Sequence, residues 1–272
     1  MRNVFVEGIQ GAGKSTLVGH LAKALPQLHV CREGDYSPVD LAWCAYMTQE
    51  QYEAVRDRFP SLKEEIARNT VREGDRVIVT YTKIHTDDRS VFETFEAYEI
   101  YNGRKTLRDL KEIVLSRYRR FQDSGYLFEC AFFQNVVEDL ILYHQLGDEE
   151  ILSFYRELWK EVDKVHFLLV YLYSEKMEEN INLIRKERCD SEGREVWYEM
   201  MMDYLRRCPY GKARGLNSFE DLTAHLAHRQ QLELRIIRDV IGDAAVILPA
   251  KMWELDAVRA RICGGVEEGC RA

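Results

Sequence analysis

A glycine-rich stretch close to the amino terminus has the residue types needed to bind phosphate. It reads Gly8-x-x-x-x-Gly13-Lys14-Ser15. Gly8, Gly11 and Gly13 can take positive φ, so that backbone N–H groups approach phosphate oxygens with no Cβ in the way. The lysine can reach the β- and γ-phosphates, and the serine hydroxyl can ligate Mg²⁺. The stretch therefore predicts binding of a nucleoside triphosphate, taken as ATP, together with Mg²⁺.

The residues on either side of this loop predict the strand and the helix that it requires. Residues 3–6 form a short apolar run, and residues 16–22 place apolar side chains on one helical face. The positive end of that helix dipole would add to the attraction for phosphate. Strand, loop and helix in this order are typical of the P-loop nucleotidases. We therefore expect the following residues to bind ATP: Gly8, Gly11, Ala12, Gly13, Lys14, Ser15 and Thr16.

Three carboxylates follow predicted strands and are candidates for the chemistry. Glu33 and Asp35 come at the end of the second predicted strand, residues 28–33, and Glu129 ends the next one, a short strand predicted at residues 126–129. Because ligands bind at the carboxyl edge of an open α/β sheet, we expect these acids to lie near the loop. Glu33 is predicted as the general base toward an acceptor hydroxyl. Glu129 is predicted to hold Mg²⁺ with Ser15 and, like Asp35, to contact substrate; an exposed loop acid or a helix N-cap is the alternative.

Basic residues follow the most apolar predicted strand, residues 165–173. Residues 178–188 read EENINLIRKER, and their apolar side chains recur at helical spacing. Arg185 and Arg188 project from the end of this predicted helix. We expect them to close over the phosphates, within a lid of residues 185–195, and to stabilise the transferred phosphoryl group. A solvated helix end with local ion pairs is the alternative.

Aromatic residues after Asp35 are candidates for a pocket that holds the acceptor. Residues 38–58 are predicted to be helical, which places Trp43 and Tyr46 on one face. Their rings could stack on a flat acceptor such as a base, while ordinary core packing is the alternative. Residues 98–104 and the basic stretch 117–120 are further candidates.

Composition excludes several classes of protein. The chain has 272 residues and 46% hydrophobic content, and its net charge of −8 argues against a general nucleic-acid or anionic-membrane binder. No apolar run reaches the length of a membrane span. Met1-Arg2-Asn3 leads directly into a strand, so no signal peptide is expected. The 7 cysteines are scattered without a CxxC pair, which predicts neither a zinc site nor a disulfide framework and favours a cytoplasmic location.

The alternation of strand and helix patterns predicts the fold class. We expect an α/β protein of the P-loop NTPase type, a three-layer α/β/α sandwich with a mainly parallel sheet of about five strands and a helical lid. Residues 1–262 are predicted to form a single domain with an insertion around residues 60–120. The β-rich run 76–82 is expected to pair with residues 95–101 or to lie in the insertion. The tail 263–272 has no periodicity and is expected to be poorly ordered.

Together these features resemble the thymidylate kinase and deoxynucleoside kinase families. The opening 6–16, the acid Glu33 after the second strand, the strand and basic helix 167–188, and the final helix and strand 232–248 occur in the same order. The resemblance implies a small-molecule kinase that transfers phosphate from ATP to a nucleoside, a nucleotide or a similar acceptor. It also makes a homodimer a reasonable expectation. The chain lacks the Asn-Lys-x-Asp guanine reader of a GTPase.

One departure from these families concerns the acceptor. They usually carry an acid-arginine pair after the third strand, whereas this chain reads Glu129-Cys130-Ala131. The missing arginine points to a divergent acceptor, such as a modified nucleoside or a hydroxylated antibiotic. It also supports an alternative function, a regulatory nucleotide-binding protein that hydrolyses ATP slowly and has no small-molecule acceptor. Action on an RNA or DNA end is a third hypothesis, which the acidic charge disfavours.

Overall fold

The computed structural model describes residues 1–263, which divide into two compact units. The first unit contains residues 1–30 and the described residues from 122 onward, and the second contains residues 31–121. The predicted insertion around residues 60–120 lies within the second unit. Within the described part of the chain, no helix is both long and apolar enough to cross a lipid bilayer.

A five-stranded sheet forms the centre of the first unit. Its strands, in spatial order, are β2 (His29–Cys31), β6 (Tyr126–Glu129), β1 (Asn3–Gly8), β7 (Phe167–Tyr173) and β8 (Ala245–Pro249). β1 pairs in parallel with β6 and β7, and β7 pairs in parallel with β8. This confirms the predicted α/β class with a mainly parallel sheet. Because β1 is the central strand, the loop that follows it emerges between the carboxyl ends of β6 and β7.

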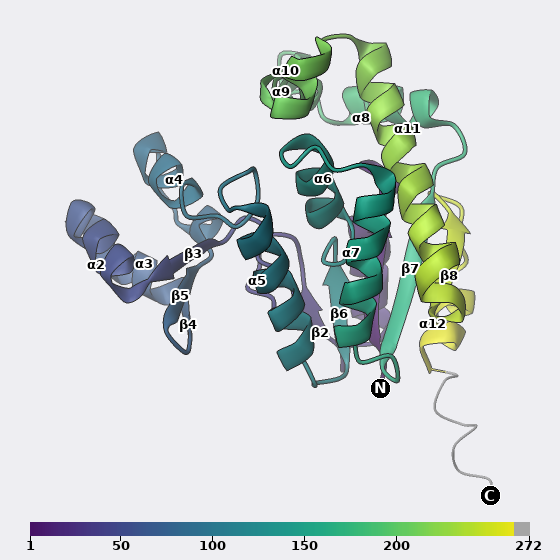
Figure 1. Cartoon of the computed structure of the whole chain (residues 1–272), viewed down its shortest axis with the longest axis horizontal. Helices are drawn as coiled ribbons and strands as arrows, with labels where there is room; N and C mark the ends of the chain where they lie inside the picture. The colour runs from purple at the N-terminus through teal and green to yellow at the C-terminus, as the bar shows by residue number, and fades with distance from the viewer. Residues whose placement is uncertain (264–272) are drawn as a thin grey trace, which may run out of the picture. The chain divides into compact units, whose positions relative to one another are not determined.

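Helices cover this sheet and account for most of the remaining chain. They are α1 (Lys14–Ala24), α6 (Gln134–Leu142), α7 (Asp148–Glu161), α8 (Met177–Glu187), α9 (Val196–Arg207), α10 (Pro209–Arg214), α11 (Phe219–Ile236) with the π-helical η3 (Ile237–Ile241), the 3₁₀ turn η4 (Gly242–Ala244) and α12 (Leu255–Cys263). α1 packs on β1 and β6, and α12 packs on α1. α7 and α11 lie in front of the sheet in Figure 1. Apart from Cys263, the tail expected at residues 263–272 lies outside the described residues.

The three central strands of this sheet, β6, β1 and β7, are mostly buried, because helices pack over them. β1 is buried along its whole length, as expected for a central parallel strand. The ring of Phe5 stacks on Phe128 of β6 and on Phe167 of β7, with both centroid distances at 4.7 Å. This aromatic stack holds the three central strands in register, so the ends of β1 and β6 are positioned by packing as well as by backbone hydrogen bonds.

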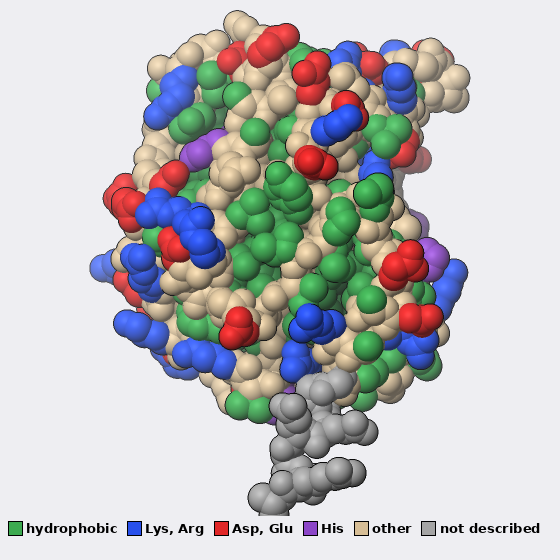
Figure 2. Space-filling model, turned by 90° about the vertical axis from the view of Figure 1, so that its right-hand side faces the viewer, with side chains coloured by type: hydrophobic (Ala, Val, Ile, Leu, Met, Phe, Trp, Pro, Cys, Tyr) green, Lys and Arg blue, Asp and Glu red, His purple; other side chains and the backbone are tan. Residues whose placement is uncertain are grey.

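β8 forms an exposed outer edge of the sheet. Ile247 on this strand is 49% exposed, and Met252 in the turn that follows is 75% exposed. Figure 2 shows the face of the molecule at this side, where hydrophobic side chains gather between groups of charged ones. The strand ends at Pro249, which has no N–H to continue the ladder.

The second unit has its own small sheet and core. Its strands are β3 (Ala45–Thr48), β5 (Arg76–Val79) and β4 (Thr70–Glu73), paired antiparallel in that order. Its helices are α2 (Gln49–Arg58), the 3₁₀ turn η1 (Pro60–Leu62), α3 (Lys63–Arg68), the 3₁₀ turn η2 (Tyr81–Lys83), α4 (Arg89–Glu96) and α5 (Leu107–Arg120). Apolar residues from the strands and from α2, α3 and α4 form one buried cluster.

The structure corrects the prediction for residues 38–58 and decides between the two alternatives for residues 76–82. The helix predicted over residues 38–58 begins only at Gln49, because Thr48 and Gln51 form a capping box that defines the helix start. The residues before it form strand β3. Of the two alternatives for residues 76–82, the second is correct: β5 lies within the second unit and pairs with β3 and β4, whereas Phe95 and Glu96 of the segment 95–101 end α4.

Candidate functional site

The glycine-rich loop has the backbone conformation that its sequence predicted. Gly11 and Gly13 have φ angles of 76° and 94°, in the left-handed region that side chains disfavour. Gly11 is also restricted by packing, because a Cβ atom there would lie 2.1 Å from Cδ1 of Ile184 on α8. α1 begins at Lys14, directly after Gly13. The loop therefore leads into a helix N-terminus and is in close contact with the helix predicted to form the lid.

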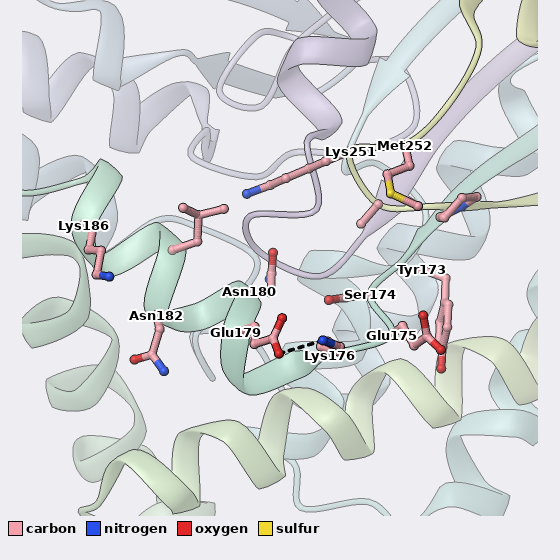
Figure 3. Close-up of a pocket in the computed structure, with 13 residues that line it drawn as sticks. Tyr173, Ser174, Glu175, Lys176, Glu179, Asn180, Asn182, Lys186, Lys251 and Met252 are labelled. Atoms are coloured by element: carbon pink, nitrogen blue, oxygen red, sulfur yellow. Dashed lines mark hydrogen bonds and ion pairs between the residues drawn. The ribbon is translucent and has the colours of Figure 1, made fainter.

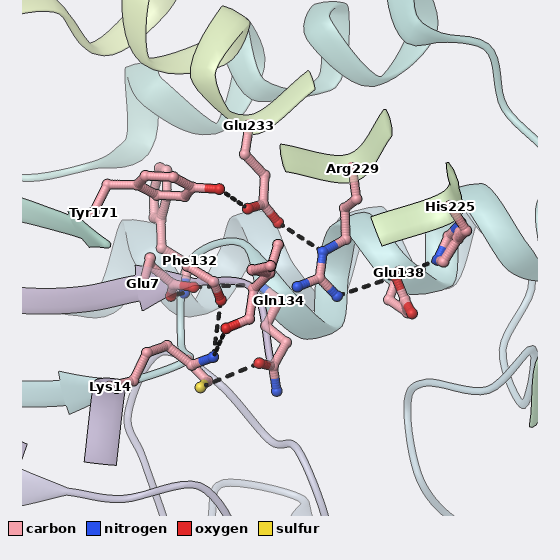
Figure 4. A network of polar contacts seen from close by, with 12 residues as sticks. Glu7, Lys14, Phe132, Gln134, Glu138, Tyr171, His225, Arg229 and Glu233 are labelled. Carbon is pink, nitrogen blue, oxygen red and sulfur yellow. Dashed lines mark hydrogen bonds and ion pairs between the residues drawn. The ribbon is translucent and has the colours of Figure 1, made fainter. Parts of the chain in front are cut away.

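Lys14 folds back over the loop that precedes it. Its side chain is buried, with 7% exposure, and its Nζ donates hydrogen bonds to the carbonyl oxygens of Gly8 at 2.8 Å and Ile9 at 3.0 Å (Figure 4). A buried ammonium group requires such acceptors. The lysine charge is thus held at the loop, where a bound phosphate could exchange with these carbonyl oxygens as its partner.

The two predicted Mg²⁺ ligands lie in contact. Ser15 donates a hydrogen bond from its hydroxyl to Oε1 of Glu129, which ends β6 and pairs in register with Val6. Residues 1–263 contain no group of three or more His, Cys, Asp or Glu side chains arranged to hold a metal. Mg²⁺ in nucleotide sites commonly takes one or two protein oxygens and completes its shell with phosphate and water. One hydroxyl and one carboxylate beside a phosphate-type loop fit that requirement.

A cavity of about 630 Å³ lies beside the loop (Figure 3). It is lined by the end of β7, one face of α8 and the turn after β8. One hydrogen bond connects its wall to the loop, from Asn180 of α8 to the carbonyl oxygen of Gln10 at 2.8 Å. Lys251 lies near the loop as well, because a Cβ atom added to Gly13 would be 3.7 Å from its Cγ. The cavity can therefore hold a group attached to phosphates bound at the loop.

Of the two arginines predicted in the lid, Arg185 lies on α8 and Arg188 directly follows this helix. The guanidinium of Arg185 donates to Glu195 from Nε at 2.8 Å and lies 4.2 Å from the ring centroid of Tyr198. Arg188 lies 6.0 Å from the ring centroid of Trp197. Both arginines thus contact the start of α9 or the residue before it. Arg185 has to exchange its partner Glu195 for phosphate oxygens if it acts in catalysis.

A chain of buried polar residues extends from β7 to α6 and α11 (Figure 4). Tyr171 donates its hydroxyl to Glu233 at 2.6 Å, and Oε1 of Glu233 lies 3.1 Å from Nε of Arg229. Arg229 also donates to Glu138 at 3.2 Å, and Glu138 lies 3.0 Å from Nε2 of His225. This network was not predicted from the sequence, because the spacing of Arg229 and Glu233 on a helix suits a solvated ion pair equally well.

Burial and neighbouring charges change the pKa values in and beside this network. Burial raises the pKa of Glu138, but the charges of His225 and Arg229 outweigh that effect and lower it to about 2. Burial raises the pKa of Glu233, even though Arg229 opposes the shift. Burial also raises the pKa of Glu7, on β1, to about 8. The carboxyl group of Glu7 is therefore mostly protonated at neutral pH.

The predicted acceptor residues belong to the second unit. Oε1 of Glu33 accepts a hydrogen bond from Nε1 of Trp43 at 3.1 Å, and Asp35 pairs with Lys83. Trp43 is 43% exposed with φ at 59°, and Tyr46 lies on β3. The prediction that the two rings share a helical face is therefore wrong. A cavity of about 450 Å³ in this unit has Trp43 in its wall, so the exposed indole is accessible to a ligand.

The further candidates in the second unit make internal contacts. Arg117 donates from Nη1 to Glu73 at 2.7 Å and from Nη2 to the carbonyl oxygen of Ser37 at 2.5 Å. Tyr81 donates its hydroxyl to Glu99 at 2.6 Å. These contacts indicate that Arg117 and Glu99 stabilise the second unit.

Comparison with known proteins does not identify a family for this chain. No protein-family model matches the chain, and no curated protein shows significant sequence similarity to it.

Proposed function

We propose that this protein is a Mg²⁺-dependent kinase that transfers a phosphoryl group from ATP to a hydroxyl or phosphate group of a small, nucleoside-like molecule. The observation that carries this proposal is the arrangement around the glycine-rich loop. Lys14 lies on the loop itself, and Ser15, which follows it, contacts Glu129 from the neighbouring strand. A cation, a hydroxyl and a carboxylate in this arrangement match the needs of bound polyphosphate and Mg²⁺.

The cavity beside α8 supports the nucleotide part of the proposal. Its volume of about 630 Å³ is in the usual range for a small-molecule site. Asn180 connects it to the loop by a hydrogen bond, Lys251 lies near Gly13 of the loop, and Lys186 adds a cation to its wall. We assign it to the base and ribose of ATP, with the phosphates at the loop.

The remaining residues have roles that follow from their chemistry. Glu33 would take the proton of the acceptor hydroxyl, which makes that oxygen a better nucleophile. Arg185 and Arg188 would stabilise the charge on the transferred phosphoryl group. Trp43 offers an exposed aromatic face for a flat acceptor, and Asp35 and Tyr46 remain candidate acceptor contacts. ATP and Mg²⁺ are the cofactors, and the cytoplasm is the expected location.

An assay of ADP release tests this proposal. Mg·ATP would be supplied with deoxynucleosides, ribonucleosides, nucleoside monophosphates and hydroxylated antibiotics in turn. We expect one class to stimulate ADP release by the wild type. Lys14→Ala should abolish that stimulation, while Lys23→Ala, which removes an exposed lysine from the same helix, should not change it. Full turnover by the Lys14 variant would contradict the mechanism.

A regulatory nucleotide-binding protein is the second candidate. Two observations favour it: a cysteine follows Glu129 where related kinases usually have arginine, and Arg185 is paired with Glu195. Such a protein would bind ATP in a Lys14-dependent way and hydrolyse it slowly. Binding of ATP without stimulation by any acceptor in the panel would favour this function over the kinase.

A further inference from the structure

The turn between β6 and α6 lacks a local cap. Glu129 ends β6, Cys130 has φ at 60°, and α6 begins at Gln134. The N-cap residue, Phe133, makes no side-chain hydrogen bond to the helix. The first N–H groups of a helix have no intrahelical partner, so they need acceptors from elsewhere.

Glu7 provides these acceptors from β1, the strand next to β6. Its Oε1 accepts a hydrogen bond from the backbone N–H of Phe132 at 2.6 Å, and its Oε2 accepts a longer one from the backbone N–H of Gln134 at 3.4 Å. The side chain is fully buried, and Figure 4 shows it beside Phe132 and Gln134. A side chain on β1 thus takes the place of a local cap for α6.

Glu7 also adjoins the loop. The next residue is Gly8, whose carbonyl oxygen accepts a hydrogen bond from Lys14. On the other side, the turn that Glu7 holds directly follows Glu129. One buried side chain therefore links the strand that precedes the loop to the turn that follows the predicted metal ligand.

We infer that Glu7 is a positioning residue, which holds the turn after Glu129 so that Glu129 stays beside Ser15 as a Mg²⁺ ligand. This inference rests on the proposed function, because it concerns the same nucleotide and metal. A buried carboxyl group is costly compared with an apolar side chain of similar size. The two backbone N–H groups that it satisfies give a physical reason for its presence in the core.

Matched substitutions of Glu7 separate positioning from simple packing. Glu7→Met keeps the length of the side chain and removes both acceptors. Glu7→Gln keeps an acceptor for Phe132, and as a neutral group it resembles the protonated carboxyl. Tyr171→Phe is the control, because it removes only the hydroxyl group that donates to Glu233 and keeps the ring that packs against Phe133 in the turn.

Binding of a fluorescent ATP analogue is measured in EDTA and then over a Mg²⁺ titration. We expect all variants to bind the analogue in EDTA within about twofold of the wild type, because Lys14 and the loop amides remain. Glu7→Met should need about tenfold more Mg²⁺ for its half-maximal effect, as is usual when a group supporting a metal ligand is lost. Glu7→Gln and Tyr171→Phe should stay close to the wild type.

Two results would overturn the inference: unchanged Mg²⁺ dependence in Glu7→Met, or an equal shift in Tyr171→Phe. If Glu7→Met does not fold, Glu7→Asp replaces it, because the shorter side chain cannot reach both N–H groups; an unchanged Mg²⁺ dependence then overturns the inference equally. Failure of the wild type to bind the analogue, or to respond to Mg²⁺, is a different result. It would overturn the proposed function, and this inference with it.

Discussion

Ser15 donates a hydrogen bond to Glu129, although the two residues are 114 positions apart in the chain. The parallel pairing of β1 with β6 brings them together, since Glu129 lies opposite Val6. The glycine-rich loop then reverses the chain so that the start of α1 returns to the end of β6. The contact depends on both the sheet order and the loop conformation.

The Ser15–Glu129 contact predicts coupled effects on Mg²⁺ binding. Ser15→Ala and Glu129→Gln should each raise the Mg²⁺ concentration for half-maximal binding of a fluorescent ATP analogue by about tenfold. The double variant should be little worse than either single one, because both substitutions disrupt one shared arrangement. Fully additive effects in this double-mutant cycle would show that the two residues act independently.

The arginine at the end of α8 predicts a selective loss of turnover. Arg185→Gln should lower kcat about a hundredfold and change the KM for ATP much less, because its charge is needed mainly in the transition state. Arg194→Gln is the matched control, since this exposed arginine of the same region pairs with Asp190. The kinetics of ADP release provide the measurement. Equal losses in the two variants would argue against a catalytic role for Arg185.

The raised pKa of Glu7 predicts how stability depends on pH. Burial raises this pKa from 4.5 to about 8. Between these values the folded state holds a proton that the unfolded state has released. The free energy of unfolding contributed by Glu7 therefore falls as pH rises, by about 1.4 kcal/mol per pH unit.

Glu7→Gln removes this titration and serves as the reference. Urea denaturation at pH 5.5, 6.5 and 7.5 should show that the wild type loses stability relative to this variant as the pH increases. A constant difference between the two proteins across this range would mean that Glu7 is not protonated in the folded state.

The contacts of Arg117 predict a structural role within the second unit. Arg117→Ala removes the partner of Glu73, but that side chain is 25% exposed and keeps a hydrogen bond from Tyr36, so the expected cost is about 1–3 kcal/mol. Hydrogen exchange should become faster across residues 31–121. Arg120→Ala, at the exposed end of the same helix, should leave exchange in this unit unchanged. Normal protection in the Arg117 variant would show that the pair contributes little.

Local signals in the sequence were sufficient for much of the first unit. The strand ending in Glu129 was predicted at its observed bounds, residues 126–129, because a short apolar run ended by a carboxylate is a local feature. The helix that carries Arg185 was predicted within a residue of its observed bounds, from its apolar spacing. The helical prediction is wrong at residues 45–48, because a short strand there directly precedes a capped helix and no turn residue separates the two.

The sequence by itself determined the glycine-rich loop, the order of strands and helices around it and the α/β class, because these depend on spacing, turn residues and the period of apolar side chains. Only the tertiary structure showed that Glu7 caps a helix from another strand, and that Arg229 is buried between Glu138 and Glu233. Such contacts join residues far apart in the chain, and their strength depends on exclusion of water. The local pattern of apolar residues contains no information on long-range contacts or on the exclusion of water. The roles of Glu7 and Arg229 are therefore visible only in the folded structure.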